Sequence, residues 1–270
     1  MIYCVWYPSG GFGHYISHLL NVYGQNFARP TNTNFEFGKN GNSHSIELVA
    51  KRYHGDPETY SFAFDATLNY AVLVDNGINN EGERFRKFFP SAKIIKIAYT
   101  DVSWPIVANT MIHKVIRNSL EKELPLDNRW ACNQSWAQRE KYFLFLRDHP
   151  LRLAWKPTTT DSNLLVDDLL DYNQLYSKFA QFGISMENFY GSWIEWKKIN
   201  SVYFDPVMEA KQIISDVKSD VPRNLEHIKD LWSQAVVYYF LWLEFEKEVP
   251  HNDFKNFFND TSDIKNWLKL

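Results

Sequence analysis

The chain has 270 residues, a formal net charge of −3 and 45% hydrophobic residues, which suits a globular protein with a substantial core. No linker, repeat or low-complexity tract divides it, so we expect a single domain over residues 1–270. No block of Lys or Arg stands out, and this distribution argues against nucleic-acid binding through bulk charge.

Cysteine usage and hydropathy indicate the cellular compartment in which the protein is expected. Cys4 and Cys132 are the two cysteines, they lie far apart in the sequence, and their number excludes a disulfide framework. The N-terminus lacks the basic region of a secretory signal peptide, and the longest apolar run, residues 235–243, is too short to cross a bilayer. We therefore expect a cytoplasmic protein with no membrane partner. The composition does not indicate an oligomeric state.

The most informative stretch is an apolar run followed by a glycine-rich turn and a helical pattern. Ile2 to Tyr7 predicts a buried strand, which Pro8 ends. Apolar residues then recur at helical spacing: Phe12, Tyr15, Ile16, Leu19, Leu20 and Tyr23. Backbone N–H groups and the helix dipole converge on an anion, typically phosphate, in this strand–turn–helix geometry. A tight connection without a ligand is the alternative.

The candidate anion-binding residues run from the turn into the first helical residues: Ser9, Gly10, Gly11, Phe12, Gly13, His14 and Tyr15. The helix also has a polar face, formed by His14, His18, Asn21 and Gln25, which favours exposure of both histidines to solvent. The spacing of His14 and His18 is that of two zinc ligands, but no third ligand is evident, and we expect no metal.

Two further apolar runs predict strands of the same sheet. Residues 71–74 form one, ending in Asp75 before a turn, and a short helix follows over residues 81–89. Residues 93–99 form the next, closed by Thr100, and Ser103 can cap a long helix that extends to residue 120. This alternation predicts an α/β fold with a central, mostly parallel sheet that helices cover on both sides.

The remaining segments are less regular. The polar residues 29–45 could form a hairpin around Asn40 and Gly41, or residues 45–54 could form a short helix, and the pattern does not decide between them. A polar connection over residues 121–132 precedes a helix at residues 134–147. A last strand is expected at residues 163–170 and a helix at residues 171–183. The part from about residue 185 to 270 is predicted to be helical, and its clearest helical pattern lies at residues 225–247.

Three separated pieces resemble the sulfotransferase family in order and spacing. YPSGG at residues 7–11 resembles its phosphosulfate-binding loop, and FPSAKIIKIA at residues 89–98 resembles the strand that precedes its 3′-phosphate site. Residues 163–183 are similar to the strand and helix that follow. The resemblance covers roughly residues 1–25 and 70–185. It implies a fold like that of P-loop nucleoside triphosphate hydrolases, of sulfotransferase type, and transfer of a sulfonate group from phosphoadenosine phosphosulfate to a hydroxyl of a small molecule or saccharide.

The match to the family pattern is incomplete at its charged positions. The loop lysine of the family falls at Ser9, and the arginine that grips the 3′-phosphate falls near Tyr99. The catalytic histidine falls near Asp75, and the helix serine falls near Asn109. The resemblance therefore implies roles for other groups: His14 as a cationic donor, Asp75 as the base, and Thr100 and Asn109 as further contacts to the donor.

Two other functions stay open. A P-loop kinase or nucleotide hydrolase is suggested by residues 72–75, which resemble a Walker B strand end, although no Gly-Lys-Ser/Thr follows the glycine turn. A non-catalytic protein that binds an anion or nucleotide on a sulfotransferase-like scaffold is favoured by the missing lysine and arginine.

Overall fold

The structure is a computed structural model, and it describes residues 1–31, 49–50, 64–75, 81–111, 136–154, 156, 163–219 and 231–245. The chain forms two compact units. One comprises residues 1–103 and 153–201, and the other comprises residues 104–152 and 202–270. Single-domain behaviour of the whole chain stays a prediction.

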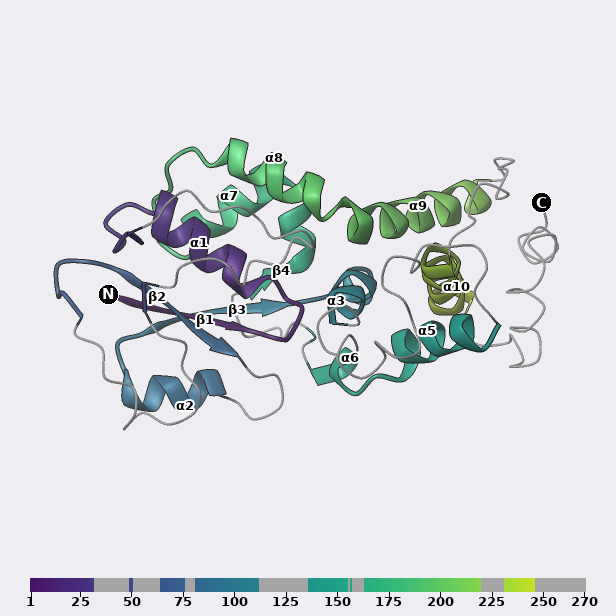
Figure 1. The fold of residues 1–270 in the computed structure, drawn as a ribbon, viewed down its shortest axis with the longest axis horizontal. Helices are drawn as coiled ribbons and strands as arrows, with labels where there is room; N and C mark the ends of the chain where they lie inside the picture. Colours follow the sequence, from purple (N-terminus) through teal and green to yellow (C-terminus); the bar gives the residue numbers. More distant parts are fainter. Residues whose placement is uncertain are drawn as a thin grey trace. The chain divides into compact units, whose positions relative to one another are not determined.

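Within the described residues, the first unit is built on a parallel sheet of four strands in the order β2-β1-β3-β4 (Figure 1). The strands are β1 (Ile2–Tyr7), β2 (Tyr70–Asp75), β3 (Lys93–Ala98) and β4 (Asn163–Leu165). All three pairings are parallel. The predicted mixed α/β class and parallel sheet are confirmed. Most residues of β1 are buried, as expected for a strand whose apolar residues run without alternation because both faces are covered.

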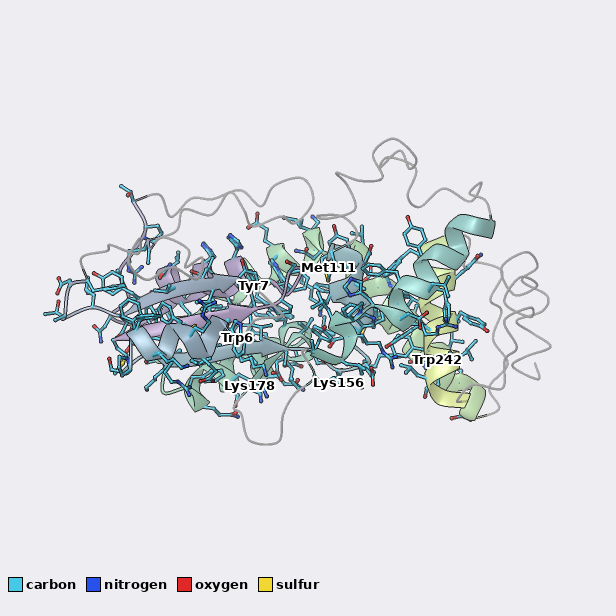
Figure 2. All side chains as sticks on the ribbon, turned by 90° about the horizontal axis from the view of Figure 1, so that it is seen from below. Trp6, Tyr7, Met111, Lys156, Lys178 and Trp242 are labelled. Atoms are coloured by element: carbon cyan, nitrogen blue, oxygen red, sulfur yellow. The ribbon has the colours of Figure 1, made fainter. Side chains whose placement is uncertain are left out.

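Helices cover the two faces of this sheet. Figure 1 shows α1 (Gly13–Tyr23), α7 (Tyr172–Gln181) and α8 (Tyr190–Ile199) on one side and α2 (Glu81–Phe88) on the other. The side chains of successive residues of β1 point to opposite faces of the sheet, because side chains alternate along a strand. The Tyr7 ring lies against Gly13 of α1, whereas the Trp6 ring lies against Gly82 of α2 (Tyr7 and Trp6 are labelled in Figure 2).

The predicted strand at residues 163–170 is wrong in its second half. Only Asn163–Leu165 pair with β3, and Val166–Leu170 form a 3₁₀ helix, η4. The cause is local, because Asp168 Oδ2 accepts a hydrogen bond from the Leu165 N–H at 2.7 Å and holds the chain in a turn. The helix that follows begins as predicted, with Asp171 capping α7 by accepting a hydrogen bond from the Gln174 N–H at 2.9 Å.

The described part of the second unit is helical. It contains α3 (Trp104–Met111), α5 (Trp136–Asp148) and α10 (Leu231–Phe245), while α6 (Leu151–Ala154) and α9 (Ser201–Lys218) straddle the boundaries between the units. The predicted helices at residues 134–147 and 225–247 are thus present over the residues of these ranges that the structure describes. Aromatic contacts join α5 to α10: Phe143 meets the Tyr238 ring at 4.9 Å and Tyr142 meets the Trp232 ring at 5.8 Å, both edge-on.

Several expectations fall outside the described residues. They are the hairpin or helix within residues 32–48 and 51–63, the turn after Asp75, the helix extension over residues 112–120, the connection at residues 121–132, Cys132, and the segments after residue 245. Cys4 is described, and it is a buried free thiol as predicted, with a pKa that burial raises. None of the described helices is both long and apolar enough to span a bilayer.

Candidate functional site

The carboxyl ends of three strands bring most of the predicted site residues to one edge of the sheet. β1 ends at Tyr7 and leads into the turn at residues 9–13. β2 ends at Asp75, which pairs with Tyr7 in the parallel register, and β3 ends two residues before Thr100. Because the carboxyl ends of parallel strands lie at the same edge, the turn, Asp75 and Thr100 share it.

The strand order places a switch point at this edge. From β1 the chain continues to β2 on one side, whereas from β3 it continues to β4 on the other side. In open α/β sheets, ligands bind in the crevice outside the carboxyl ends of two adjacent strands whose connections run in opposite directions. Here these strands are β1 and β3, which the glycine turn and Thr100 follow.

The turn after β1 has a defined backbone geometry. The Gly11 N–H donates to the Pro8 carbonyl oxygen at 2.8 Å, and Gly10, the third residue of this turn, has a φ of 84°. Such a positive φ at that position is the reason that a turn of this kind uses glycine. Phe12 follows with φ 60° and ψ 22°, a left-handed conformation that is uncommon for a bulky residue, and α1 begins at Gly13.

Contacts within the protein explain why residue 13 is a glycine. A Cβ atom added there would lie 2.3 Å from two atoms of the Tyr7 ring, so a side chain has no room between the helix start and the strand. Gly11 is similarly constrained, since an added Cβ would lie 2.8 Å from Pro8 Cδ. Both glycines therefore allow the turn to pack on its own strand, which agrees with the alternative of a tight connection.

The turn is largely covered. Residues 10–15 are all buried, and within residues 9–15 Ser9 alone is partly exposed. Phe12 packs edge-on against Trp196 of α8, with ring centroids 5.2 Å apart. Tyr15 is fully buried, and burial raises the pKa of its hydroxyl. Ser9 is thus the side chain through which a ligand can reach this turn without displacing a buried group.

His14 lies beside the end of β1. Its side chain is only 4% exposed, its Nδ1 atom lies 3.4 Å from the Tyr7 hydroxyl, and the two rings meet edge-on at 5.9 Å. This contact connects the first turn of α1 to the last residue of β1. The imidazole therefore lies at the sheet edge that also carries Asp75 and Thr100.

The expectation that the polar face of α1 meets solvent is wrong. His14, His18 and Asn21 are all buried, and only Gln25, beyond the helix end, is exposed. The reason is that α1 is enclosed on all sides, so its hydrophilic side chains lie inside the protein. Burial lowers the pKa of His18 to about 4, which keeps this imidazole neutral near pH 7.

Asp75 is placed by its backbone. Its pairing with Tyr7 puts it at the end of β2, beside the strand that carries the glycine turn. The residues that follow it, Asn76 and Gly77, lie outside the described residues. Its role as a base stays a prediction.

Thr100 belongs to a hydrogen-bonded cluster that joins the ends of β3 and β4. Its hydroxyl donates to Asp167 Oδ2 at 3.0 Å, and its N–H donates to Ser103 Oγ at 3.0 Å. The Ser103 hydroxyl in turn donates to Asp167. Sequence reasoning treated Asp167 only as part of a strand, although its position just after an apolar run, like that of Asp75, is a usable signal.

Among the described residues, Lys156 brings a positive charge to the segment that follows β3. Lys156 Nζ contacts Asp101 Oδ2 at 2.6 Å, next to Thr100 in the sequence. Tyr99, where the family arginine falls, is only 1% exposed and its ring belongs to the core. The sequence pattern did not indicate Lys156 as a site residue, because it lies 55 residues from Asp101 in the chain.

Asn109 belongs to the second unit. It lies in α3 with 2% of its surface exposed, and its Nδ2 atom has no hydrogen-bond partner among the described residues. Its predicted contact to a donor stays a prediction. No group of three or more His, Cys, Asp or Glu side chains in the described part of the chain could hold a metal ion.

Comparison with models of protein families, with curated proteins and with solved structures finds no match to this chain. The candidate site therefore rests on the residues and the geometry above.

Proposed function

We propose that the chain binds a nucleotide-type anion at the carboxyl edge of its sheet and transfers a sulfonate group from phosphoadenosine phosphosulfate to a hydroxyl acceptor. The observation that carries this proposal is the switch point between β1 and β3, which the turn at residues 9–13 and Thr100 flank. An anion there would meet the N-terminal end of α1, where the helix dipole favours negative charge.

The described residues at this edge fit the donor through hydrogen bonds and the positive charge of Lys156. The Ser9 hydroxyl and the amides at the start of α1 would hold the phosphosulfate end. Lys156, near the end of β3, would supply positive charge on the side where the family uses an arginine. The nearby carboxylates of Asp101 and Asp167 already have partners, in Lys156 and in the hydroxyls of Thr100 and Ser103.

Two side chains have roles in transfer under this proposal. Negative charge on the sulfonyl oxygens and on the bridging oxygen would be stabilised by His14 and by the helix start, an electrostatic contribution that is commonly the largest in catalysis. Asp75, at the adjacent strand end, would accept the proton of the acceptor hydroxyl as that oxygen attacks sulfur. The reaction releases adenosine 3′,5′-bisphosphate.

A second candidate is binding without catalysis. It is favoured by Ser9, which stands in place of the loop lysine of the family. On this alternative the sheet edge retains an anion or nucleotide and transfers nothing.

Calorimetric titration with adenosine 3′,5′-bisphosphate, with ADP as comparison, tests the donor site. We expect micromolar binding of the bisphosphate that Ser9→Glu abolishes, because the new carboxylate repels the ligand. Ser185→Glu is the matched control, since Ser185 is exposed between α7 and α8. Absence of bisphosphate binding would rule out the donor site.

Turnover separates the two candidates. Release of adenosine 3′,5′-bisphosphate from phosphoadenosine phosphosulfate would be measured with a panel of phenol, alcohol and saccharide acceptors. Transfer that is lost in Asp75→Asn while bisphosphate affinity is kept supports catalysis. Tight bisphosphate binding with no transfer to any acceptor favours the non-catalytic candidate.

A further inference from the structure

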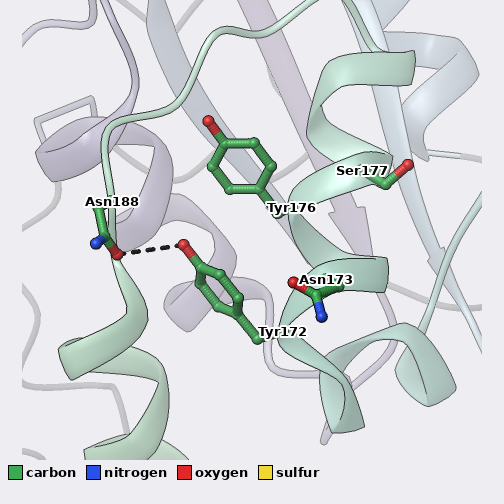
Figure 3. A pocket seen from close by; sticks show the side chains of 5 residues that line it. All are labelled: Tyr172, Asn173, Tyr176, Ser177 and Asn188. Atoms are coloured by element: carbon green, nitrogen blue, oxygen red, sulfur yellow. Dashed lines mark hydrogen bonds between the residues drawn. The ribbon is translucent and has the colours of Figure 1, made fainter.

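A cavity of about 410 Å³ lies between α7 and the start of α8 in the first unit. Five of the described residues line it, four from α7 and one from the segment before α8: Tyr172, Asn173, Tyr176, Ser177 and Asn188 (Figure 3). Its volume falls within the range of about 300–1,000 Å³ that is usual for small-molecule sites. None of its lining residues belongs to the predicted donor site.

Two tyrosine rings form the aromatic part of this cavity. Tyr176 is 39% exposed, so part of its side chain is accessible to a ligand. The Tyr172 ring is held by neighbouring rings, with centroid distances of 4.9 Å to Phe189 and 5.1 Å to Tyr190. The aromatic surface is therefore in place before any ligand arrives, which reduces the entropic cost of binding.

Polar groups around these rings have unused hydrogen-bonding capacity. Asn188 Oδ1 accepts hydrogen bonds from the Tyr172 hydroxyl at 3.2 Å and from the Tyr190 N–H at 2.9 Å (the first is the dashed line in Figure 3). These two bonds fix the orientation of the amide and leave its Nδ2 hydrogens without a partner in the described part of the chain. The side chains of Asn173 and Ser177 likewise form no hydrogen bond with described residues, and both are exposed.

None of the described residues that line the cavity carries a formal charge. The polar groups of these residues are two amides and three hydroxyls, which are neutral near pH 7. Nucleic acids and ligands with several phosphates are usually bound with the help of Lys or Arg, and neither residue type is found among the described residues that line this cavity. A neutral ligand with many hydroxyl groups, which both donate and accept hydrogen bonds, matches the amides and hydroxyls, and its C–H faces match the exposed ring.

We propose that this cavity binds a neutral saccharide, with a sugar C–H face on the Tyr176 ring and sugar hydroxyls on Asn173, Ser177 and Asn188. The inference does not rest on the proposed sulfonate transfer, because the cavity shares no residue with the donor site.

Saturation-transfer NMR of the full chain tests this proposal with cellotriose, chitotriose, maltotriose and xylotriose as probes. AMP and a heparin-derived disaccharide serve as charged comparisons. We expect at least one neutral trisaccharide to bind, with an affinity that falls about tenfold in Tyr176→Ala and several-fold in Asn173→Leu. Tyr176→Phe retains the ring and should retain most of the affinity.

Phe88→Ala is the matched control, because Phe88 is an exposed aromatic residue of α2, 52% accessible, on the other side of the sheet. Its saccharide affinity should equal that of the parent chain. Asn173→Leu removes only an exposed amide without a described partner, so it tests the cavity even where Tyr176→Ala fails to fold. The proposal is overturned if no neutral trisaccharide binds, if neither cavity variant changes the affinity, or if AMP or the heparin disaccharide binds more tightly.

Discussion

The Tyr15 ring of α1 lies parallel to the Trp196 indole of α8, with centroids 4.4 Å apart and planes that differ by 2°. Trp196 also meets Phe12, the residue in left-handed conformation directly before α1. One fully buried indole from α8 thus contacts both the end of the glycine turn and the first turn of the helix. The geometry of the candidate anion site therefore depends on a residue nearly two hundred positions away in the chain.

Trp196→Ala should destabilise the protein by about 3–5 kcal/mol, because it removes two aromatic contacts and leaves a large cavity beside α1. Urea unfolding followed by circular dichroism measures this change in the free energy of unfolding. Ile194→Ala in the same helix is the control, since Ile194 is 43% exposed and should cost below about 1 kcal/mol. Equal effects of the two substitutions would contradict the assigned packing.

Gly13→Ala should destabilise by about 1–3 kcal/mol, because the added methyl group would lie 2.3 Å from atoms of the Tyr7 ring. Gly191 provides the contrast within α8, where an added Cβ meets no atom within 4 Å. Gly191→Ala should be neutral or stabilise by about 0.5 kcal/mol, because alanine loses less conformational entropy in a helix. Thermal unfolding of both variants tests the pair, and a Gly13→Ala protein as stable as the parent would refute the close contact.

His18 should make the protein sensitive to mild acid. Its pKa is about 4 in the folded chain against an ordinary value of 6.5, so the unfolded state binds more protons and stability falls as the pH drops from about 6.5 to 4. The full effect is on the order of 3 kcal/mol, from about 1.4 kcal/mol per pKa unit. Urea unfolding between pH 7.5 and 4 should show a shallower decline for His18→Gln. Parallel curves for the two proteins would exclude His18 as the source.

Ser9→Lys tests the proposed donor site by adding a positive charge at the position where Ser9→Glu adds a negative one. A lysine at this partly exposed position adds a cation where the sulfotransferase resemblance places one, so bisphosphate affinity should rise about tenfold and decrease with added salt. Ser185→Lys adds the same charge between α7 and α8 and should leave the affinity unchanged. Equal affinities of the two lysine variants would place the bound anion away from the turn.

The local pattern of the sequence determined much of the first unit. The runs at Ile2–Tyr7, 71–74 and 93–99 are β1, β2 and β3 with ends shifted by at most a residue or two, and the helical spacing after the glycine turn is α1. Their nearly continuous apolar character predicted a parallel sheet, because such strands are buried on both faces. Signals of this kind depend on neighbours within a few residues, which the sequence contains directly.

The tertiary structure alone decided how these elements meet. The order β2-β1-β3-β4, the bonds from Thr100 and Ser103 to Asp167, and the Lys156–Asp101 contact all join distant residues. The same holds for the buried polar face of α1, which its spacing predicted to be exposed. Periodicity tells which side chains share a face of a helix, whereas burial depends on what packs against that face from elsewhere in the chain.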